Sequence, residues 1–378
     1  MSRVFDLAVV GAGILGLAHA LAAARRGLSV VVIDREAEVV GASVRNFGFV
    51  TVSGQQQGTC WRRALRSRDV WDEVAAVAGI AVEQRGLLVV AQRADAMALL
   101  EAFHATTMGE GCTLMAPNDA RRCHGDVLST DRPLAGALWS PHERRVESRT
   151  AVPKLARWMS EALGVTIVRR LAVRDVTPGK VHTADGVFAA ERVVICPGDD
   201  LVTLFPERIA ALGLRRCRLH MLKVAPQPGF RLPGAVMSDL SLVRYLGYAE
   251  LPEAAALLAR LRAEQPRHLD HGVHLIAVQG GDGGLVVGDS HDEAWSPQPF
   301  ADAAIDELIM DELLAVLDLP DVRIVERWIG TYASLPGTLM VCDAPDPSIR
   351  LVIVTSGTGA STAFAIGEET VAELFGEP

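Results

Sequence analysis

The chain has 378 residues, of which 49% are hydrophobic and 22% are charged, and its formal net charge is −9 at pH 7. This length is more than one simple core usually holds, so the sequence predicts a globular protein of two domains. The negative charge argues against nucleic acid and anionic membranes as partners. The six cysteines form no C-x-x-C pair and no zinc-like spacing, so we expect reduced thiols, no metal site and a cytoplasmic protein.

The N-terminal segment carries a glycine-rich turn between a predicted strand and a predicted helix. Apolar residues 6–10 precede Gly11-x-Gly13-x-x-Gly16, and residues 28–33 form a second predicted strand that ends at Asp34. The three glycines permit a tight turn, close approach of a pyrophosphate and close helix–strand packing. The pattern predicts dinucleotide binding, with Asp34 accepting hydrogen bonds from ribose hydroxyls. The uncharged run 7–24 resembles a membrane anchor, but the glycine spacing favours a buried strand and helix.

The middle of the chain predicts helices and strands in alternation, with no internal repeat and no long linker. The charged segment 141–149 is expected to be a loop, and residues 280–283 a hairpin turn. The expected helices are 14–26, 62–78, 94–108, 152–163, 251–264 and 301–317; the expected strands are 86–90, 134–139, 165–168, 172–176, 180–183, 187–189, 193–196, 216–224, 273–278, 284–288 and 323–332. Because no linker separates them, we expect the two domains to interleave in sequence.

A second glycine-rich turn lies near the C-terminus. Residues 350–355 predict a strand, Ser356-Gly357-Thr358-Gly359 a turn, and residues 360–375 a helix. Two such turns at opposite ends of the chain suggest that one long cofactor is held from both ends. A helix N-terminus offers free N–H groups and the positive end of its dipole at each turn.

Together these motifs resemble the FAD-dependent oxidoreductases of the D-amino-acid oxidase superfamily, in the glycine oxidase and sarcosine oxidase branch. The resemblance extends over most of the chain, through both turns, the loop 41–48 and the segment 193–198. It implies an α/β fold in which a Rossmann-like FAD-binding domain, with a parallel sheet and a β-meander, interleaves with an antiparallel-sheet α+β substrate domain. By position we assign residues 1–85, 148–219 and 329–378 to the first domain, and residues 86–147 and 220–328 to the second.

The resemblance also implies which residues bind FAD. The last turn is expected at the N1/C2=O edge of the flavin, where a positive helix end stabilises negative charge. Ser361 and Thr362 are equally well explained as N-caps of the last helix. Some relatives attach flavin through positions that correspond to Arg45 and Gly330, and neither can form the bond, so non-covalent FAD is expected. The expected cofactor residues are Gly11, Ala12, Gly13, Ile14, Gly16, Asp34, Arg35, Ser43, Arg45, Asn46, Phe47, Gly48, Val173, Pro197, Gly198, Gly357, Thr358, Gly359, Ala360, Ser361 and Thr362.

The resemblance implies an arginine that holds an anionic substrate head, assisted by tyrosine or histidine. The candidates are Arg244 with Tyr245, Arg45 and His220. Each has a plainer explanation: the tyrosines Tyr245, Tyr248 and Tyr332 as packing at the domain interface, Arg45 as a loop anchor, and His220 as a structural residue. His220 and Lys223 lie on opposite faces of one predicted strand, so at most one faces the flavin. His271 and His274 could bracket a lid, and their spacing with Asp289 and His291 gives no convincing metal set.

An amine substrate fits a site with no obvious base, because a neutral amine can pass a hydride directly to flavin. We therefore expect oxidation of a C–N bond in a small anionic amine by hydride transfer to flavin N5, then imine hydrolysis to an aldehyde or keto product. One alternative is a hydroxy-acid or polyol-phosphate dehydrogenase, with His220 as the base. Another is the FAD-binding subunit of a heteromeric dehydrogenase.

A narrower resemblance concerns Arg45 to Gly48, Arg244-Tyr245 and residues 356–369. These segments resemble a subgroup associated with bacterial phosphonate breakdown. The implied substrates are aminoalkylphosphonates, such as 2-aminoethylphosphonate or its N-methyl form. The sequence leaves open whether the head group is carboxylate or phosphonate, whether O2 or another molecule accepts the electrons, and whether the protein is a homo-oligomer.

Overall fold

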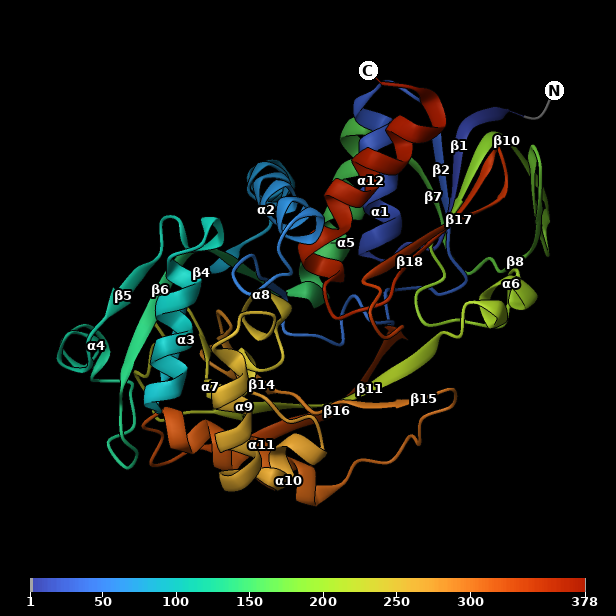
Figure 1. Cartoon of the computed structure of the whole chain (residues 1–378). Coiled ribbons are helices and arrows are strands. Elements are labelled where there is room, and N and C mark those ends of the chain that lie inside the picture. Colours follow the sequence, from blue (N-terminus) through green and yellow to red (C-terminus); the bar gives the residue numbers. More distant parts are fainter. Residues whose placement is uncertain (1–2, 378) are drawn as a thin grey trace.

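The chain passes repeatedly between two β-sheets (Figure 1). The computed structural model describes residues 3–377. The strands of the first sheet are β1 (Val4–Val10), β2 (Val30–Ile33), β7 (Thr166–Val168), β8 (Val173–Thr177), β9 (Lys180–Thr183), β10 (Gly186–Ile195), β17 (Met340–Asp346) and β18 (Ile349–Val354). Their order is β17-β18-β10-β1-β2-β7, and β9 joins β10 to β8 as an antiparallel meander.

The centre of the first sheet is parallel. β1 lies between β2 and β10, and β18 pairs with β10, all in the same direction. The carboxyl ends of these strands therefore meet at one edge of the sheet, which is where ligands bind in open α/β sheets. Cys196 N–H donates to the Val10 carbonyl at 2.8 Å, and Gly11 N–H donates to the Ile33 carbonyl at 2.8 Å. These bonds bring the first glycine turn beside the ends of β2 and β10.

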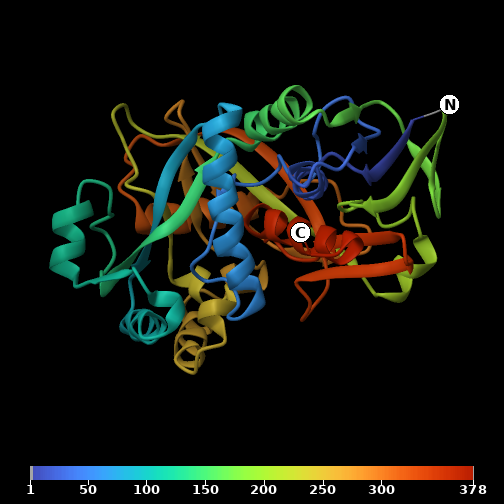
Figure 2. The same cartoon turned by 90° about the horizontal axis from the view of Figure 1, so that it is seen from above.

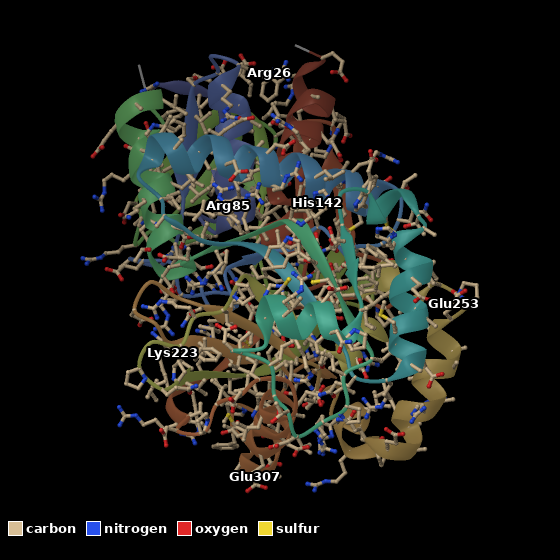
Figure 3. The ribbon with its side chains drawn as sticks, turned by 90° about the vertical axis from the view of Figure 1, so that its left-hand side faces the viewer. Arg26, Arg85, His142, Lys223, Glu253 and Glu307 are labelled. Atoms are coloured by element: carbon tan, nitrogen blue, oxygen red, sulfur yellow. The ribbon has the colours of Figure 1, made fainter. Side chains whose placement is uncertain are left out.

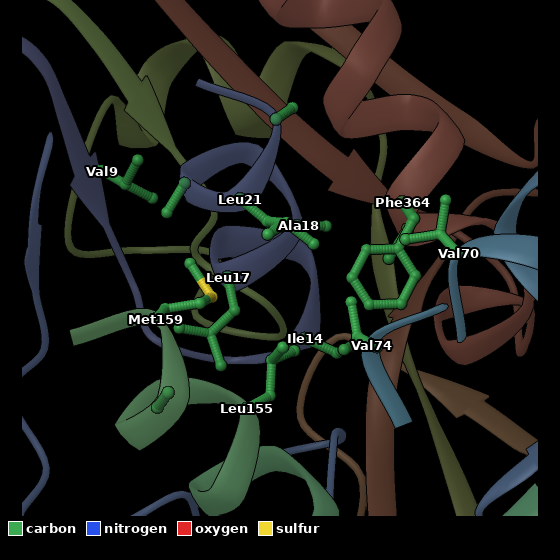
Figure 4. Packing of buried hydrophobic residues seen from close by; sticks show 14 of the residues in the cluster. Val9, Ile14, Leu17, Ala18, Leu21, Val70, Val74, Leu155, Met159 and Phe364 are labelled. Atoms are coloured by element: carbon green, nitrogen blue, oxygen red, sulfur yellow. The ribbon is translucent and has the colours of Figure 1, made fainter. Parts of the chain in front are cut away.

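Four helices cover one face of this sheet: α1 (Ile14–Arg25), α2 (Thr59–Ala78), α5 (Ser148–Leu163) and α12 (Gly359–Phe375). α12 contacts both α1 and α2, as the view from above also indicates (Figure 2). Leu17 of α1 packs toward Leu155 and Met159 of α5, while Phe364 of α12 packs toward Val74 of α2 (Figure 4). The helices that begin at the two glycine-rich turns thus share one apolar core. On the first sheet's other side, a separate apolar cluster includes α6 (Pro206–Ala211).

The second sheet is mostly antiparallel and has ten strands. They are β3 (Phe49–Val50), β4 (Val82–Ala91), β5 (Thr113–Met115), β6 (Gly136–Val146), β11 (Arg215–Ala225), β12 (Ala235–Met237), β13 (Ile276–Gln279), β14 (Leu285–Gly288), β15 (Asp292–Ala294) and β16 (Arg323–Ser334). Their order is β15-β11-β14-β13-β12-β4-β6-β3, with β16 on β11 and β5 on β6. The two sheets together confirm the predicted α/β class.

The remaining helices lie with the second sheet. They are α3 (Ala94–His104), the single 3-10 turn η1 (Thr107–Gly109), α4 (Pro117–His124), α7 (Asp239–Leu242), α8 (Leu246–Ala249), α9 (Ala254–Glu264), α10 (Pro266–Asp270) and α11 (Ala303–Val316). Side chains alternate along β11 between two cores: Leu219 and Met221 join the one that includes α3 and α9, whereas Leu222 and Val224 join the one that includes α11. No helix within residues 3–377 is long and apolar enough to cross a membrane.

One sequence prediction about the second sheet differs from the structure, and one stays untested. The predicted loop 141–149 is wrong, because β6 continues to Val146. Its charged residues are stabilised inside the protein: buried Glu143 accepts a hydrogen bond from Ser53 N–H at 2.7 Å, and Arg145 pairs with Glu147 at 2.8 Å. The expected domain boundaries at 85/86, 219/220 and 328/329 fall within β4, β11 and β16. The division into two domains at those positions stays a prediction.

Candidate active site

The first glycine turn is too tight for side chains. At Gly16, a Cβ atom would lie 1.9 Å from the Gly11 carbonyl oxygen; at Gly11, where φ is +102°, it would lie 2.4 Å from the Cys196 carbonyl oxygen. Polar groups gather at the same turn. Ala12 N–H donates to Asp34 Oδ2 at 2.6 Å, and Ile14 N–H donates to Ser43 Oγ at 2.9 Å. The turn, the end of β2 and the loop 41–48 therefore form one polar platform.

The last glycine turn follows β18 and opens α12. The backbone N–H groups of Gly359 and Ala360 donate no hydrogen bond within residues 3–377. Ser361 and Thr362, by contrast, use their hydroxyls inside the protein. Ser361 Oγ accepts from Thr51 N–H at 2.9 Å, and Thr362 Oγ1 donates to the Thr358 carbonyl at 2.9 Å. Neither caps α12 and neither lines the cavity described next, so the direct cofactor contact expected of these two hydroxyls is not supported.

A cavity of about 510 Å³ lies between the two sheets and extends from the first turn to the last. Its walls include residues of the loop 41–48, the α7–α8 segment and the strands β11, β13 and β16. The expected site residues that line it are Gly13, Ile14, Gly16, Ser43, Arg45, Asn46, Phe47, Gly198, Arg244, Tyr245, Gly357, Thr358, Gly359 and Ala360. Both glycine turns therefore open onto one space, as a long dinucleotide requires.

The other expected cofactor residues lie outside the cavity wall. Gly11 and Ala12 form the inner part of the first turn, and Asp34 follows β2. Arg35 pairs with Asp200 at 2.5 Å. The remaining members are Gly48, Val173 and Pro197, of which Val173 is buried in the meander. None of these residues lines the cavity wall.

The loop 41–48 is shaped by Asn46. Its Nδ2 donates to the Ala42 carbonyl at 2.7 Å, and its Oδ1 accepts from Gly48 N–H at 2.7 Å and from Ser148 Oγ at 3.1 Å. Gly48 has φ +67°, and a Cβ there would lie 1.8 Å from the Val146 carbonyl oxygen. Asn46 is therefore engaged in fixing the loop that presents Arg45 and Phe47 to the cavity.

Gly330 lies against the same loop, because its Cβ position would be 2.8 Å from the Arg45 carbonyl oxygen. A larger residue would displace the loop at this point. Arg45 is exposed, and its guanidinium pairs with no carboxylate within residues 3–377. The two positions considered for covalent flavin attachment are thus neighbours, and neither side chain is a nucleophile.

Arg244 projects into the cavity from the short connection between α7 and α8. It forms no salt bridge in the described part of the chain. Tyr245 and Tyr332 line the same space, and burial raises the pKa of both hydroxyls, which keeps them protonated as hydrogen-bond donors. Tyr248 is fully buried against Phe103, with ring centroids 4.5 Å apart, and does not line the cavity. An unpaired cation with two donors nearby can bind an anion.

His220, which the sequence suggested for the active site, lies outside the cavity. It lies on the face of β11 opposite Leu219, is 1% exposed, and its Nδ1 lies 3.5 Å from Asp306 Oδ1 of α11. Strand alternation directs it away from the cavity. Lys223 is also outside, since its Nζ pairs with Asp282 at 2.5 Å near the outer edge of the molecule (Figure 3). Neither of the two β11 candidates faces the expected flavin site.

Three residues that the sequence did not select converge on the cavity: His274, Asp289 and His291. His274 Nε2 lies 2.9 Å from Asp289 Oδ1, and His291 Nε2 lies 3.7 Å from Oδ2. The hairpin β13–β14 brings them together, since His274 precedes it and the other two follow it. The sequence had suggested His274 as part of a lid and had considered the three residues only as an unconvincing metal set; the predicted hairpin was the other hint that they lie close together. His271, in contrast, is exposed and does not line the cavity.

The side-chain donor atoms of this trio lie within 4.8 Å of one another. The rings of His274 and His291 are stacked, with centroids 5.3 Å apart and planes inclined by 17°. Burial and, to a smaller extent, the nearby Arg244 lower the pKa of His291 to about 3, against the opposing effect of Asp289. His291 is therefore a neutral ring near pH 7.

Comparisons with known proteins identify the class. A family model described as DAO, FAD dependent oxidoreductase, matches residues 6–373. The chain therefore belongs to the DAO family of FAD-dependent oxidoreductases, and its cofactor is FAD. The donor set fits this group, because both glycine turns and the free N–H groups at α12 face one cavity. The expectations of an FAD enzyme and of this family are confirmed.

Solved structures give the same fold. Glycine oxidase from Geobacillus kaustophilus is 17% identical, with a TM-score of 0.77 and coverage of 100% of this chain and 96% of that one. L-proline dehydrogenase from P. horikoshii is 17% identical, with a TM-score of 0.78 and coverage of 99% and 94%. L-alpha-glycerophosphate oxidase from Mycoplasma pneumoniae, with FAD bound, is 14% identical, with a TM-score of 0.75 and coverage of 98% and 95%. No curated protein matches the chain. At these identities the likeness is one of fold.

Proposed function

We propose that this protein oxidises a C–N bond in a small anionic amine, an amino acid or an aminoalkylphosphonate. The observation that carries the proposal is Arg244, an arginine without a salt-bridge partner in the described residues that lines the cavity between the two glycine turns. A guanidinium presents a planar fork of donors that matches carboxylate and phosphonate oxygens. The names of two structural neighbours, glycine oxidase and L-proline dehydrogenase, are in keeping with such a substrate.

Bound FAD supplies the two-electron acceptor for a hydride from the substrate carbon. In this proposal Arg244 holds the anionic head, and the hydroxyls of Tyr245 and Tyr332 donate further hydrogen bonds. Both tyrosines stay protonated because burial raises their pKa values. The free N–H groups of Gly359 and Ala360 face the far end of the cavity and stabilise negative charge there. The imine that results from this oxidation then reacts with water to give an aldehyde or keto product.

The phosphonate form of the proposal rests on a second cation. Arg45 is exposed to the same cavity and has no carboxylate partner within residues 3–377. Two arginines match the two negative charges of a phosphonate better than they match the single charge of a carboxylate. The family resemblance implies that a lysine above the flavin favours the reaction with O2, and Lys223 was the lysine considered for this role. Because Lys223 lies outside the cavity, we favour an electron acceptor other than O2. The cytoplasmic location remains part of the proposal.

A second candidate is a hydroxy-acid or polyol-phosphate dehydrogenase. His274 beside Asp289 supports it, because a histidine oriented by a carboxylate can accept a hydroxyl proton. This pair now takes the role for which His220 was considered.

Product analysis tests the proposal. The purified holoenzyme is incubated with N-methyl-2-aminoethylphosphonate, 2-aminoethylphosphonate, sarcosine or glycine and an artificial electron acceptor. We expect methylamine or ammonia together with an aldehyde or keto product from at least one of them. Arg244→Met lowers turnover, whereas Lys223→Met, outside the cavity, leaves it unchanged. A keto product from glycolate or glycerol phosphate, with no amine released from any amine tested, would instead establish the second candidate.

A further inference from the structure

Asp289 is the most enclosed charged group of the cavity. Its carboxylate is 4% exposed and belongs to the cavity wall. Although His274 Nε2 lies 2.9 Å from Oδ1, this oxygen has no well-directed hydrogen bond from any described residue. A buried carboxylate without such a bond is costly, so it calls for a cationic or donating group.

The two flanking histidines face this carboxylate. His291 Nδ1 is bonded to the Gly272 carbonyl at 3.0 Å, so its Nε2 faces Asp289. His274 Nδ1 lies 3.3 Å from Ser241 Oγ, and its Nε2 also faces Asp289. Burial raises the pKa of Asp289, but its contact with His274 and the nearby positive charge of Arg244 bring the pKa below the ordinary value. The carboxylate is therefore ionised.

The cavity thus offers opposite charges to one ligand. Arg244 is near enough to influence both Asp289 and His291 electrostatically, yet forms no salt bridge with Asp289. The other carboxylate of the wall, Glu293, is exposed and accepts a hydrogen bond from Ser334 Oγ at 2.8 Å. Asp289 is the buried carboxylate of the wall, and no arginine or lysine within residues 3–377 pairs with it.

We propose that Asp289 binds the ammonium group of a zwitterionic substrate whose anionic head is held by Arg244. This inference rests on the function proposed above and narrows it. A hydroxy acid of the same shape brings no positive charge, so it would leave Asp289 buried and unpaired. Sites built to pair with a polar group discriminate strongly against analogues that lack it. The substrate therefore binds as a protonated amino acid or aminoalkylphosphonate, and its ammonium proton passes to the Asp289–His274 pair before the neutral amine gives up a hydride.

The test uses probes that bind but offer no N–H bond. Glycine betaine is compared with tert-butylacetate, and trimethylammoniomethylphosphonate with neopentylphosphonate; in each pair carbon replaces the charged nitrogen. Binding to the oxidised holoenzyme is followed by the change in its visible flavin spectrum. We expect at least one cationic probe to bind about tenfold or more tightly than its carbon isostere, as one unscreened charge contact allows.

Variants assign the preference to one residue. Asp289→Asn brings the ratio of dissociation constants in each pair close to one, whereas Glu293→Gln, the matched carboxylate of the same wall, retains it. Loss of the preference in Glu293→Gln alone would overturn the proposal. The absence of any preference in the unaltered enzyme, including the case in which no probe binds, would also overturn it. That result does not depend on whether Asp289→Asn folds. If amines reduce the flavin but no preference exists, this inference fails while the proposed function stands.

Discussion

The substitution Gly16→Ala tests the first glycine turn. The new Cβ would lie 1.9 Å from the Gly11 carbonyl oxygen, while real Cβ atoms essentially never approach closer than 3.0 Å, so the turn must move by the difference of 1.1 Å. The obstructing atom belongs to the backbone, and no side-chain rotation relieves the contact. Overpacking of this kind costs about 1–3 kcal/mol, and we place this case at the upper end.

This strain displaces the groups expected to bind FAD at the first glycine turn, the end of β2 and the loop 41–48. Moving Gly11 displaces Ala12 N–H from Asp34 and Ile14 N–H from Ser43. We expect the dissociation constant of FAD to rise about 100-fold, which corresponds to about 2.7 kcal/mol. The assay is titration of the apoprotein with FAD, followed by quenching of flavin fluorescence.

Gly27→Ala is the matched control. Gly27 has φ +77° and no atom within 4 Å of its Cβ position. Alanine there costs about 1 kcal/mol of backbone strain but leaves the platform untouched, so stability falls and FAD affinity does not. If Gly16→Ala retained the FAD affinity of the parent while folding normally, the assignment of this turn to the cofactor would be refuted.

Three further predictions concern other parts of the molecule. Arg244→Met should lower the rate of flavin reduction per unit substrate concentration by about 100-fold or more, because two charge-assisted hydrogen bonds are lost; stopped-flow reduction measures it, and a parent-like rate in Arg244→Lys would contradict a forked contact. His220→Asn should leave that rate within about threefold of the parent, since His220 faces α11, and a large loss would restore it to the site. The stability of the apoprotein should fall as the pH drops from 6.5 toward 3. Burial holds the pKa of His19 near 4 and that of His291 near 3, whereas histidines of the unfolded chain take up protons near pH 6.5. Urea unfolding of His19→Gln and His291→Gln should show a shallower fall of stability with pH, and an unchanged pH dependence would contradict the prediction.

Local patterns predicted the first sheet well. The apolar runs of β1, β2 and β18 and the glycine turns after β1 and β18 depend on close contacts that only glycine permits, so they leave a clear mark in the sequence. The hairpin of β13 and β14 was also correct, because the five residues that connect these strands are rich in glycine. Where the backbone geometry permits only glycine, a glycine in the sequence indicates that geometry.

The substrate side was harder to predict because it depends on contacts between distant segments. Charged residues 143 and 145 suggested a loop, yet tertiary partners hold them inside β6. His220 and His274 are both single histidines on or beside strands, and only the pairing of β11, β14 and β13 decides that the second faces the cavity. Asp289 gave no local signal, since its significance comes from two histidines and an arginine that the fold assembles around it.

The most direct test of the central claim is anaerobic titration of the FAD-loaded single chain with matched amine and hydroxyl compounds. The pairs are 2-aminoethylphosphonate with 2-hydroxyethylphosphonate, and glycine and sarcosine with glycolate. If the cavity holds the anionic head at Arg244 and the ammonium at Asp289, one of the amines bleaches the visible flavin band and its hydroxyl counterpart does not. Bleaching by a hydroxyl compound alone, or by no member of the panel in a chain that has bound FAD, would contradict the account.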